Sequence, residues 1–250
     1  MKRNLLIILT LCLFASFQSC KKTPLSIGRI VTETHALPDF SEVYLNDNIS
    51  LTIVRSDTCY IEITTGENII ENITSNVSDN ILSLCNTNNL DWIRTYDYEL
   101  SATLYYKNIQ KIVSNSSGTL NSRNQFNDPD FDDYYWIEVD GGSGDIDIIL
   151  NDCKKVHFLY DSGTSRVTFR GENNHYMQID KHSYGILDAR NCAVQRIDIH
   201  NRAIADCYIW ATDVLNAQIS HCGNIYYKGE PDRISITYGD FAKGQLIHLN

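Results

Sequence analysis

Residues 177–199 read MQIDKHSYGILDARNCAVQRIDI and contain the pattern on which the fold depends. Two apolar pairs, Met177/Ile179 and Ile197/Ile199, stand 20 residues apart, and a turn-forming stretch follows the first of them. Alternation with a period of two is typical of a strand with one buried face. Because a strand–turn unit of this length cannot bury its apolar face alone, its repetition indicates stacked coils.

The same unit recurs through the C-terminal half of the chain. Turns rich in Gly, Ser and Asn interrupt it, and the second members of successive pairs are 17 to 21 residues apart. The aligned pairs are Ile137/Val139, Val156/Phe158, Met177/Ile179, Ile197/Ile199, Ala217/Ile219 and Ile234/Ile236. Helical repeats are usually longer, about 33 to 47 residues, and leucine-rich repeats carry a signature that is absent. We therefore predict an all-β parallel β-solenoid, right-handed and β-helix-like, with coils of about 20 residues.

The N-terminal half contains strand-like runs without this regular spacing. Turn signals such as Asn46-Asp47-Asn48 separate them. The runs are Glu42–Leu45, Ile49–Val54, Tyr60–Thr64, Ile81–Leu84 and Leu100–Tyr105. We predict one solenoid domain over residues 29–250, more irregular to about residue 108 and built of regular coils over 109–250. The closing segment 245–250 keeps the apolar pattern, so we expect it to complete or pair with the last coil.

The first twenty residues have the features of an export signal. Lys2 and Arg3 precede an apolar run, and Ser19-Cys20 at its end resembles the lipobox of bacterial lipoproteins. We predict a signal peptide over residues 1–19 and a lipidated Cys20 followed by a polar tether to residue 28. This resemblance implies a lipid anchor in the cell envelope, and the lack of an acidic run after Cys20 favours the outer membrane, on either face.

Composition excludes some partners. The chain has 31 acidic and 21 basic residues, a formal charge of −10, and no basic run in its body. Such a surface is a poor match for nucleic acid or for an anionic membrane surface.

Several turns and two longer segments carry a family resemblance. The turns Ser114–Gly118 and Gly141–Gly144 are rich in Ser and Gly, DFSEV (39–43) opens the first strand, and GNIYYKGEP (223–231) lies near the end. Together, and in this order, these segments resemble the head GIN domain family of auto-transporter adhesins over roughly residues 30–250. The resemblance implies a β-helix-like fold and an adhesive role, and it supplies no catalytic residue. The turns at 181–185 and 200–203 depart from the pattern.

Metal and cofactor sites are not expected. GGSGDID (141–147) resembles a calcium-binding repeat, but it occurs once and has Ile146 where a carboxylate is needed. His182, His200 and the His221-Cys222 pair follow three successive apolar pairs at unequal offsets, which places them in different columns.

Six cysteines remain beyond the signal and the lipidation position. An exported chain permits up to three disulfides among them, and the sequence leaves the pairing open. They are Cys59, Cys85, Cys153, Cys192, Cys207 and Cys222.

Acidic residues suggest an enzymatic alternative. Parallel β-helices include polysaccharide-degrading enzymes, in which paired carboxylates carry the chemistry. Candidate carboxylates are Asp140, Asp145, Asp147, Asp161, Asp180 and Asp198. They alternate with apolar neighbours, as solubilising residues do on an outer strand face, and no recurrent His or Arg accompanies them. We therefore assign no catalytic residue.

Aromatic residues cluster in the acidic segment NQFNDPDFDDYY (124–135) and just after it. We interpret this segment as a surface loop, and Phe131, Tyr134, Tyr135 and Trp136 as candidate members of a binding surface, since aromatic rings anchor sugars and protein partners.

The combined expectation is a non-enzymatic envelope lipoprotein that binds a glycan or a protein along the solenoid surface. A polysaccharide-degrading enzyme and a structural envelope spacer are the alternatives. The sequence leaves the oligomeric state open.

Overall fold

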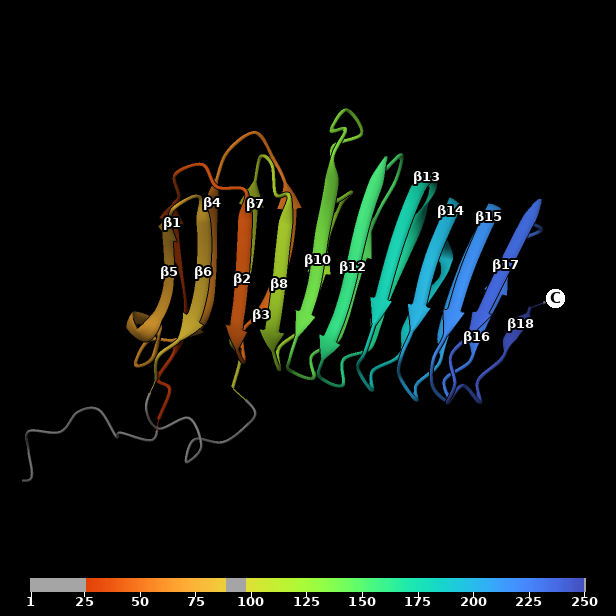
Figure 1. Cartoon of the computed structure of the whole chain (residues 1–250). Coiled ribbons are helices and arrows are strands. Elements are labelled where there is room, and N and C mark those ends of the chain that lie inside the picture. Colours follow the sequence, from red (N-terminus) through yellow and green to blue (C-terminus); the bar gives the residue numbers. More distant parts are fainter. Residues whose placement is uncertain (1–25, 89–97, 250) are drawn as a thin grey trace, which may run out of the picture.

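The alternating residues form strands that stack in parallel register, coil upon coil (Figure 1). The computed structural model describes residues 26–88 and 98–249. Ile197 lies between Met177 of the preceding coil and Leu215 of the following coil, and the register advances by 17 to 22 residues per coil. The predicted all-β parallel solenoid is therefore confirmed.

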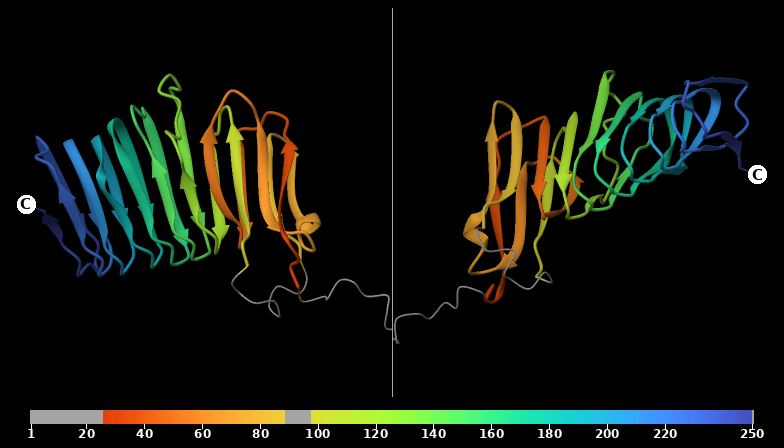
Figure 2. Two further views of the ribbon diagram at one scale, coloured as in Figure 1. Left: turned by 180° about the vertical axis from the view of Figure 1, so that it is seen from behind. Right: turned by 60° about the horizontal axis from the view of Figure 1, so that its bottom comes forward.

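Each regular coil crosses two sheets that face one another, as the tilted view in Figure 2 shows. The first sheet contains β5 (Ile73–Ser78), β6 (Ile81–Asn86), β2 (Glu42–Asp47), β8 (Lys111–Ser116), β10 (Tyr134–Asp140), β12 (Lys155–Ser162), the C-terminal parts of β13 (Val167–Lys181), β14 (Leu187–Asn201) and β15 (Cys207–Ile219), and β17 (Arg233–Tyr238).

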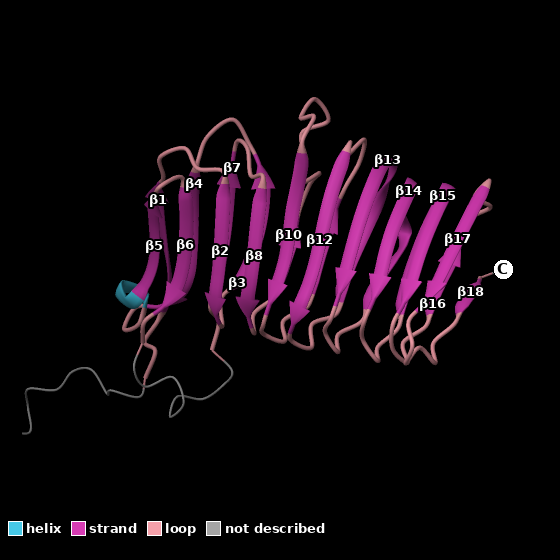
Figure 3. Cartoon of the chain, in the orientation of Figure 1, coloured by secondary structure: helices cyan, strands magenta, loops and turns pink. Residues whose placement is uncertain are grey.

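The second sheet runs alongside it. It contains β1 (Ile30–Ala36), β4 (Tyr60–Gly66), β7 (Ser101–Tyr106), β3 (Ser50–Arg55), β9 (Leu120–Ser122), β11 (Ile146–Ile149), the N-terminal parts of β13 to β15, β16 (Ile225–Lys228) and β18 (Leu246–His248). Strands β13, β14 and β15 pass through both sheets. The helical segment within the described residues is one 3₁₀ turn, Ile70–Asn72 (Figure 3).

The N-terminal end differs in strand direction. Here β1 pairs with β4, β4 with β7 and β5 with β6, all antiparallel, which confirms the irregular N-terminal strands. Strands β2 and β3 nevertheless join the parallel stack, through β8 and β9. The closing strand β18 pairs with β16, as the sequence predicts for the last residues.

Inward-pointing residues form one core from Phe40 to Ile225. Five of the six predicted apolar pairs lie in it, each side chain no more than 4% exposed. The prediction is wrong for the last pair: Ile234 is 43% exposed and Ile236 is 37% exposed. Both point inward on β17, but β17 is the last strand of the first sheet, so no further coil covers them.

The predicted alignment of the pairs is also wrong at three places, and at one of them Ala217/Ile219 stack on Ile236/Tyr238 and not on Ile234/Ile236. Ile137/Val139 stack on Phe158/Tyr160, and not on Val156/Phe158. Ile197/Ile199 stack on Leu215/Ala217, two residues before the predicted partners. A shift of two residues leaves every side chain on the same face, so alternation alone cannot reveal it.

Glycine shapes the turn at residues 141–144. Gly142 has φ of +75°, and a Cβ there would overlap the backbone of Ser116 in the preceding coil. Only glycine combines this backbone conformation with so close an approach. The Ser- and Gly-rich turns therefore stack directly upon one another.

Replacing Ile197 by Asp should unfold the solenoid. Ile197 is fully buried between two neighbouring coils, and an unpaired carboxylate there costs several kcal/mol, on the order of the whole stability of many domains. Thermal melting monitored by circular dichroism measures the effect.

The matched control is Ile236→Asp, the same change on the uncovered β17, together with Gln195→Asp at an exposed position of β14. Both variants should keep a cooperative melt near that of the parent. Equal loss at Ile197 and Ile236 would show that β17 is covered in solution.

Candidate functional site

The outer face of the first sheet carries its polar side chains in columns. Alternate residues of each strand point outward, and the parallel register places equivalent residues side by side. The middle column runs Trp136, His157, Gln178, Asp198, Asn216 and Ser235, from β10 to β17. The sequence places these residues outward, but only the register shows that they are neighbours.

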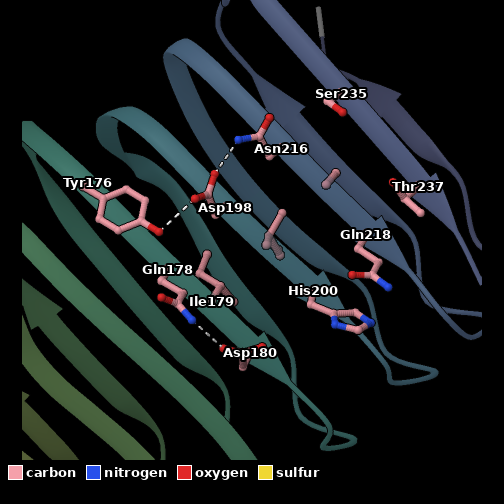
Figure 4. Close-up of a pocket in the computed structure, with 12 residues that line it drawn as sticks. Tyr176, Gln178, Ile179, Asp180, Asp198, His200, Asn216, Gln218, Ser235 and Thr237 are labelled. Atoms are coloured by element: carbon pink, nitrogen blue, oxygen red, sulfur yellow. Dashed lines mark hydrogen bonds between the residues drawn. The ribbon is translucent and has the colours of Figure 1, made fainter.

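Two further columns flank it. One runs Glu138, Leu159, Asp180, His200, Gln218 and Thr237, and the other runs Tyr134, Lys155, Tyr176, Arg196, Val214 and Arg233. Between them lies a shallow depression of about 420 Å³ that extends from β13 to β17 (Figure 4). We call this area, from Tyr134 to Thr237, the columned face.

Asp198 is held at the centre of the columned face by hydrogen bonds from three side chains. Tyr176 donates from Oη at 2.8 Å and Asn216 donates from Nδ2 at 2.6 Å (Figure 4). Arg196 donates from Nε and Nη2 at 3.2 and 2.9 Å. Partial burial alone would raise the pKa of Asp198, but these donors outweigh it and lower the pKa below the ordinary value. The carboxylate is therefore ionised and fully engaged at neutral pH.

Asp180 is held in a similar way. Its Oδ2 lies 3.0 Å from Nε2 of His157 and accepts a hydrogen bond from Gln178 at 3.1 Å. Burial acts to raise the pKa of Asp180, and these two partners lower it below its ordinary value. Neither carboxylate of the depression is a protonated acid at neutral pH.

Other polar groups of the columned face are open to a ligand. Within the described residues, the side chains of Gln218, Ser235 and Thr237 make no hydrogen bond to the protein, and all three are exposed. Asn216 uses its amide NH2 on Asp198 and leaves its carbonyl oxygen outward. These open groups are neutral amides and hydroxyls, and Arg233 of the flanking column is likewise exposed and has no ion-pair partner among the described residues.

Aromatic rings lie at the β10 end of the columned face. Trp136 is 41% exposed, and its ring centre is 4.3 Å from that of His157. Tyr134 is half-buried, with its ring centre 6.1 Å from that of Tyr176. Two of the four aromatic residues predicted for a binding surface therefore lie on the columned face.

The other two predicted aromatic residues do not. Tyr135 is 1% exposed, points into the core, and accepts a hydrogen bond from the backbone N–H of Asp128 through its hydroxyl. Phe131 is half-buried and packs on Tyr135 at 4.8 Å. The prediction is wrong for Tyr135, because Tyr135 has the same inward parity as Ile137, and Phe131 anchors the loop instead of projecting from it.

The predicted carboxylates separate onto different surfaces. Asp180 and Asp198 lie on the columned face, whereas Asp147 pairs with Arg170 at 2.7 Å on the outer face of the second sheet. Asp140, Asp145 and Asp161 are exposed at strand ends or in turns.

His182 and His200, the second of which lies on the columned face, belong to one hydrogen-bonded chain. His182 contacts Asp161 at 3.1 Å and Arg202 at 2.7 Å, and His200 contacts Arg202 and Ser220. Burial and the adjacent Arg202 lower the pKa of His200, which favours its neutral form. In the described part of the chain, no three His, Cys, Asp or Glu side chains converge as metal ligands do.

All six cysteines of the described residues are free thiols. Three are buried in the core, and burial raises the pKa of each to about 12, so they are protonated and unreactive. They are Cys153, Cys192 and Cys207.

The chain belongs to the family described as "Putative auto-transporter adhesin, head GIN domain", whose model matches residues 39–231. The Ser- and Gly-rich turns that carry the resemblance are the ones that stack between coils. No curated protein matches the chain.

Several solved structures have the same fold. A "putative adhesin" from Bacteroides fragilis is 16% identical, with a TM-score of 0.70, and the match covers 88% of this chain and 97% of that one. A "putative adhesin" from Parabacteroides merdae is 17% identical, with a TM-score of 0.59 and coverage of 89% and 97%. A "putative lipid binding protein" from Parabacteroides distasonis is 16% identical, with a TM-score of 0.59 and coverage of 89% and 98%. At these identities the likeness establishes the fold.

Proposed function

We propose that the protein is a non-enzymatic, adhesin-like binding protein of the cell envelope, which binds a glycan on the columned face. The observation that carries this proposal is the face itself. An aromatic ring at one end and a row of neutral amide and hydroxyl groups at the other match the apolar faces and hydroxyls of sugars. The family to which the chain belongs supports an adhesive role.

The chemistry of the carboxylates argues against a polysaccharide hydrolase. Such an enzyme needs one carboxylic acid with a raised pKa and a second carboxylate across the scissile bond. Asp180 and Asp198 both have lowered pKa values, and Oδ2 of Asp180 and both oxygens of Asp198 accept hydrogen bonds from the protein. These two carboxylates orient the neighbouring side chains, and because they are ionised at neutral pH they cannot act as the general acid.

The anchor is a separate part of the proposal. Residues 1–19 act as the export signal, Cys20 carries the lipid, and the outer membrane holds the protein. Both the signal and Cys20 lie outside the described residues. Within the described residues, no helix is long and apolar enough to cross a bilayer.

Trp136→Ala should weaken ligand binding by about tenfold without lowering thermal stability. The ring is exposed and contributes contact area to a bound sugar, and the loss of such a stacking contact costs about 1 to 2 kcal/mol. A glycan array and a pull-down from envelope extracts, both with the full chain in detergent, identify the ligand, and calorimetry then measures Kd.

Tyr226→Ala is the matched control, because Tyr226 is an aromatic residue on the outer face of the second sheet. It should bind as the parent does. Loss of binding in Tyr226→Ala, with binding kept in Trp136→Ala, would place the ligand on the second sheet and contradict a site on the columned face. If neither the glycan array nor the pull-down finds a ligand, the adhesive function is refuted.

Cys20→Ser should release the protein from the membrane fraction and abolish acyl labelling, since the thiol that receives the first acyl chain is gone. Fractionation of cells grown with a labelled fatty acid measures both. A parent protein that sediments with membranes but never takes up label would contradict the lipid anchor.

A further inference from the structure

The spacing of the columned face suggests how a polymer lies on it. Stacked strands are about 4.8 Å apart, so each column offers one side chain at that interval along the rod. This interval is close to the advance per sugar of an extended β-linked pyranose chain. Six strands, β10 to β17, contribute to the columns. A chain along the rod can therefore meet one coil with each sugar, for about six sugars.

A chain that followed a single strand would meet far fewer groups. Each strand presents about three outward side chains to the face, for example Tyr134, Trp136 and Glu138 on β10. No strand combines the exposed ring with the open amide of Gln218, which lies on β15. A ligand that uses both ends of the columned face has to cross the coils.

The balance of charges on the face suits an uncharged ligand. The three carboxylates of the columns each have a basic partner: Glu138 with Lys111 at 3.4 Å, Asp180 with His157 at 3.0 Å and Asp198 with Arg196 at 2.9 Å. The flanking column also contains Lys155 and Arg233, so the face as a whole has no excess of either charge and does not attract a polyanion or a polycation by net charge. A neutral polymer can bind the open amides and hydroxyls and leave the pairs intact.

From this geometry we propose that the ligand is an extended, uncharged, β-linked polysaccharide, which lies parallel to the rod axis with one sugar per coil. One sugar stacks on Trp136, and the chain ends beside Gln218, Ser235 and Thr237. A straight row of groups fits an extended chain, whereas an α-linked chain that coils would leave the face after a few sugars. This inference rests on the proposed glycan binding.

A length series of β-1,4-linked glucose oligomers tests the orientation, with calorimetry on the full chain in detergent. Affinity should rise with each added sugar and level off at about six, the number of coils in the face. Trp136→Ala and Gln218→Ala, at opposite ends, should each weaken binding of the six-sugar chain by about fivefold or more. Gln245→Ala, the same change at an exposed residue outside the face, should not.

Two matched series test the ligand class. Oligomers of α-1,4-linked glucose differ only in linkage, and oligomers of β-1,4-linked mannuronate keep an extended backbone but carry charge. Both should bind at least about tenfold more weakly than the β-glucose series. Equal or tighter binding of either series would overturn the proposed ligand class.

The outcomes separate this inference from glycan binding itself. If the six-sugar chain loses affinity in Trp136→Ala but not in Gln218→Ala, or if affinity stops rising at two or three sugars, the chain does not cross the coils. If all three series fail to bind while the array finds another glycan, this inference falls and the proposed function stands. If the array and the pull-down are also silent, both fall.

Discussion

The structure depends on the stacking of each inward side chain on its equivalents in the neighbouring coils. Ile197 is the plainest case, since it is fully buried between Met177 and Leu215. No single coil could bury such a residue, so every coil needs the one before and the one after it. The same register stacks the turns, where Gly142 lies against the backbone of Ser116, and it aligns every outward residue as well.

The columned face is therefore a consequence of the core. Because the coils are in register, polar residues that are about 20 positions apart in the chain become neighbours and satisfy one another, as Tyr176, Asp198 and Asn216 do. This network keeps Asp198 ionised and fully hydrogen-bonded, and it leaves the amide of Gln218 and the hydroxyls of Ser235 and Thr237 open toward β17. A surface of this kind is suited to holding a long ligand by many weak contacts.

Alternation in the sequence is enough to predict the all-β class, the inward-facing residues and most of the core. The position of a residue such as Phe158 in the alternating pattern decides which face of the sheet its side chain occupies. The same parity could have placed Tyr135 in the core, since it alternates with Ile137. Register could not be predicted, because a shift of two residues preserves every face. The sequence does not predict strands β1 and β5, because their apolar and polar residues do not alternate clearly. The exposure of Ile236 follows only from the position of β17 at the end of the stack. The hydrogen bonds around Asp198 could not be predicted either, because they join residues of different coils and depend on the register.

Amide hydrogen exchange, followed strand by strand on the free protein, tests most directly whether the coils form one continuous stack. In a nearest-neighbour stack the protection is greatest where both neighbours are present and falls toward an open end. We expect the slowest exchange in β12, β13 and β14, a graded increase through β15, and the fastest strand exchange in β17 and β18. Two separately protected blocks, or protection of β17 equal to that of β13, would contradict the single stack with an open C-terminal end.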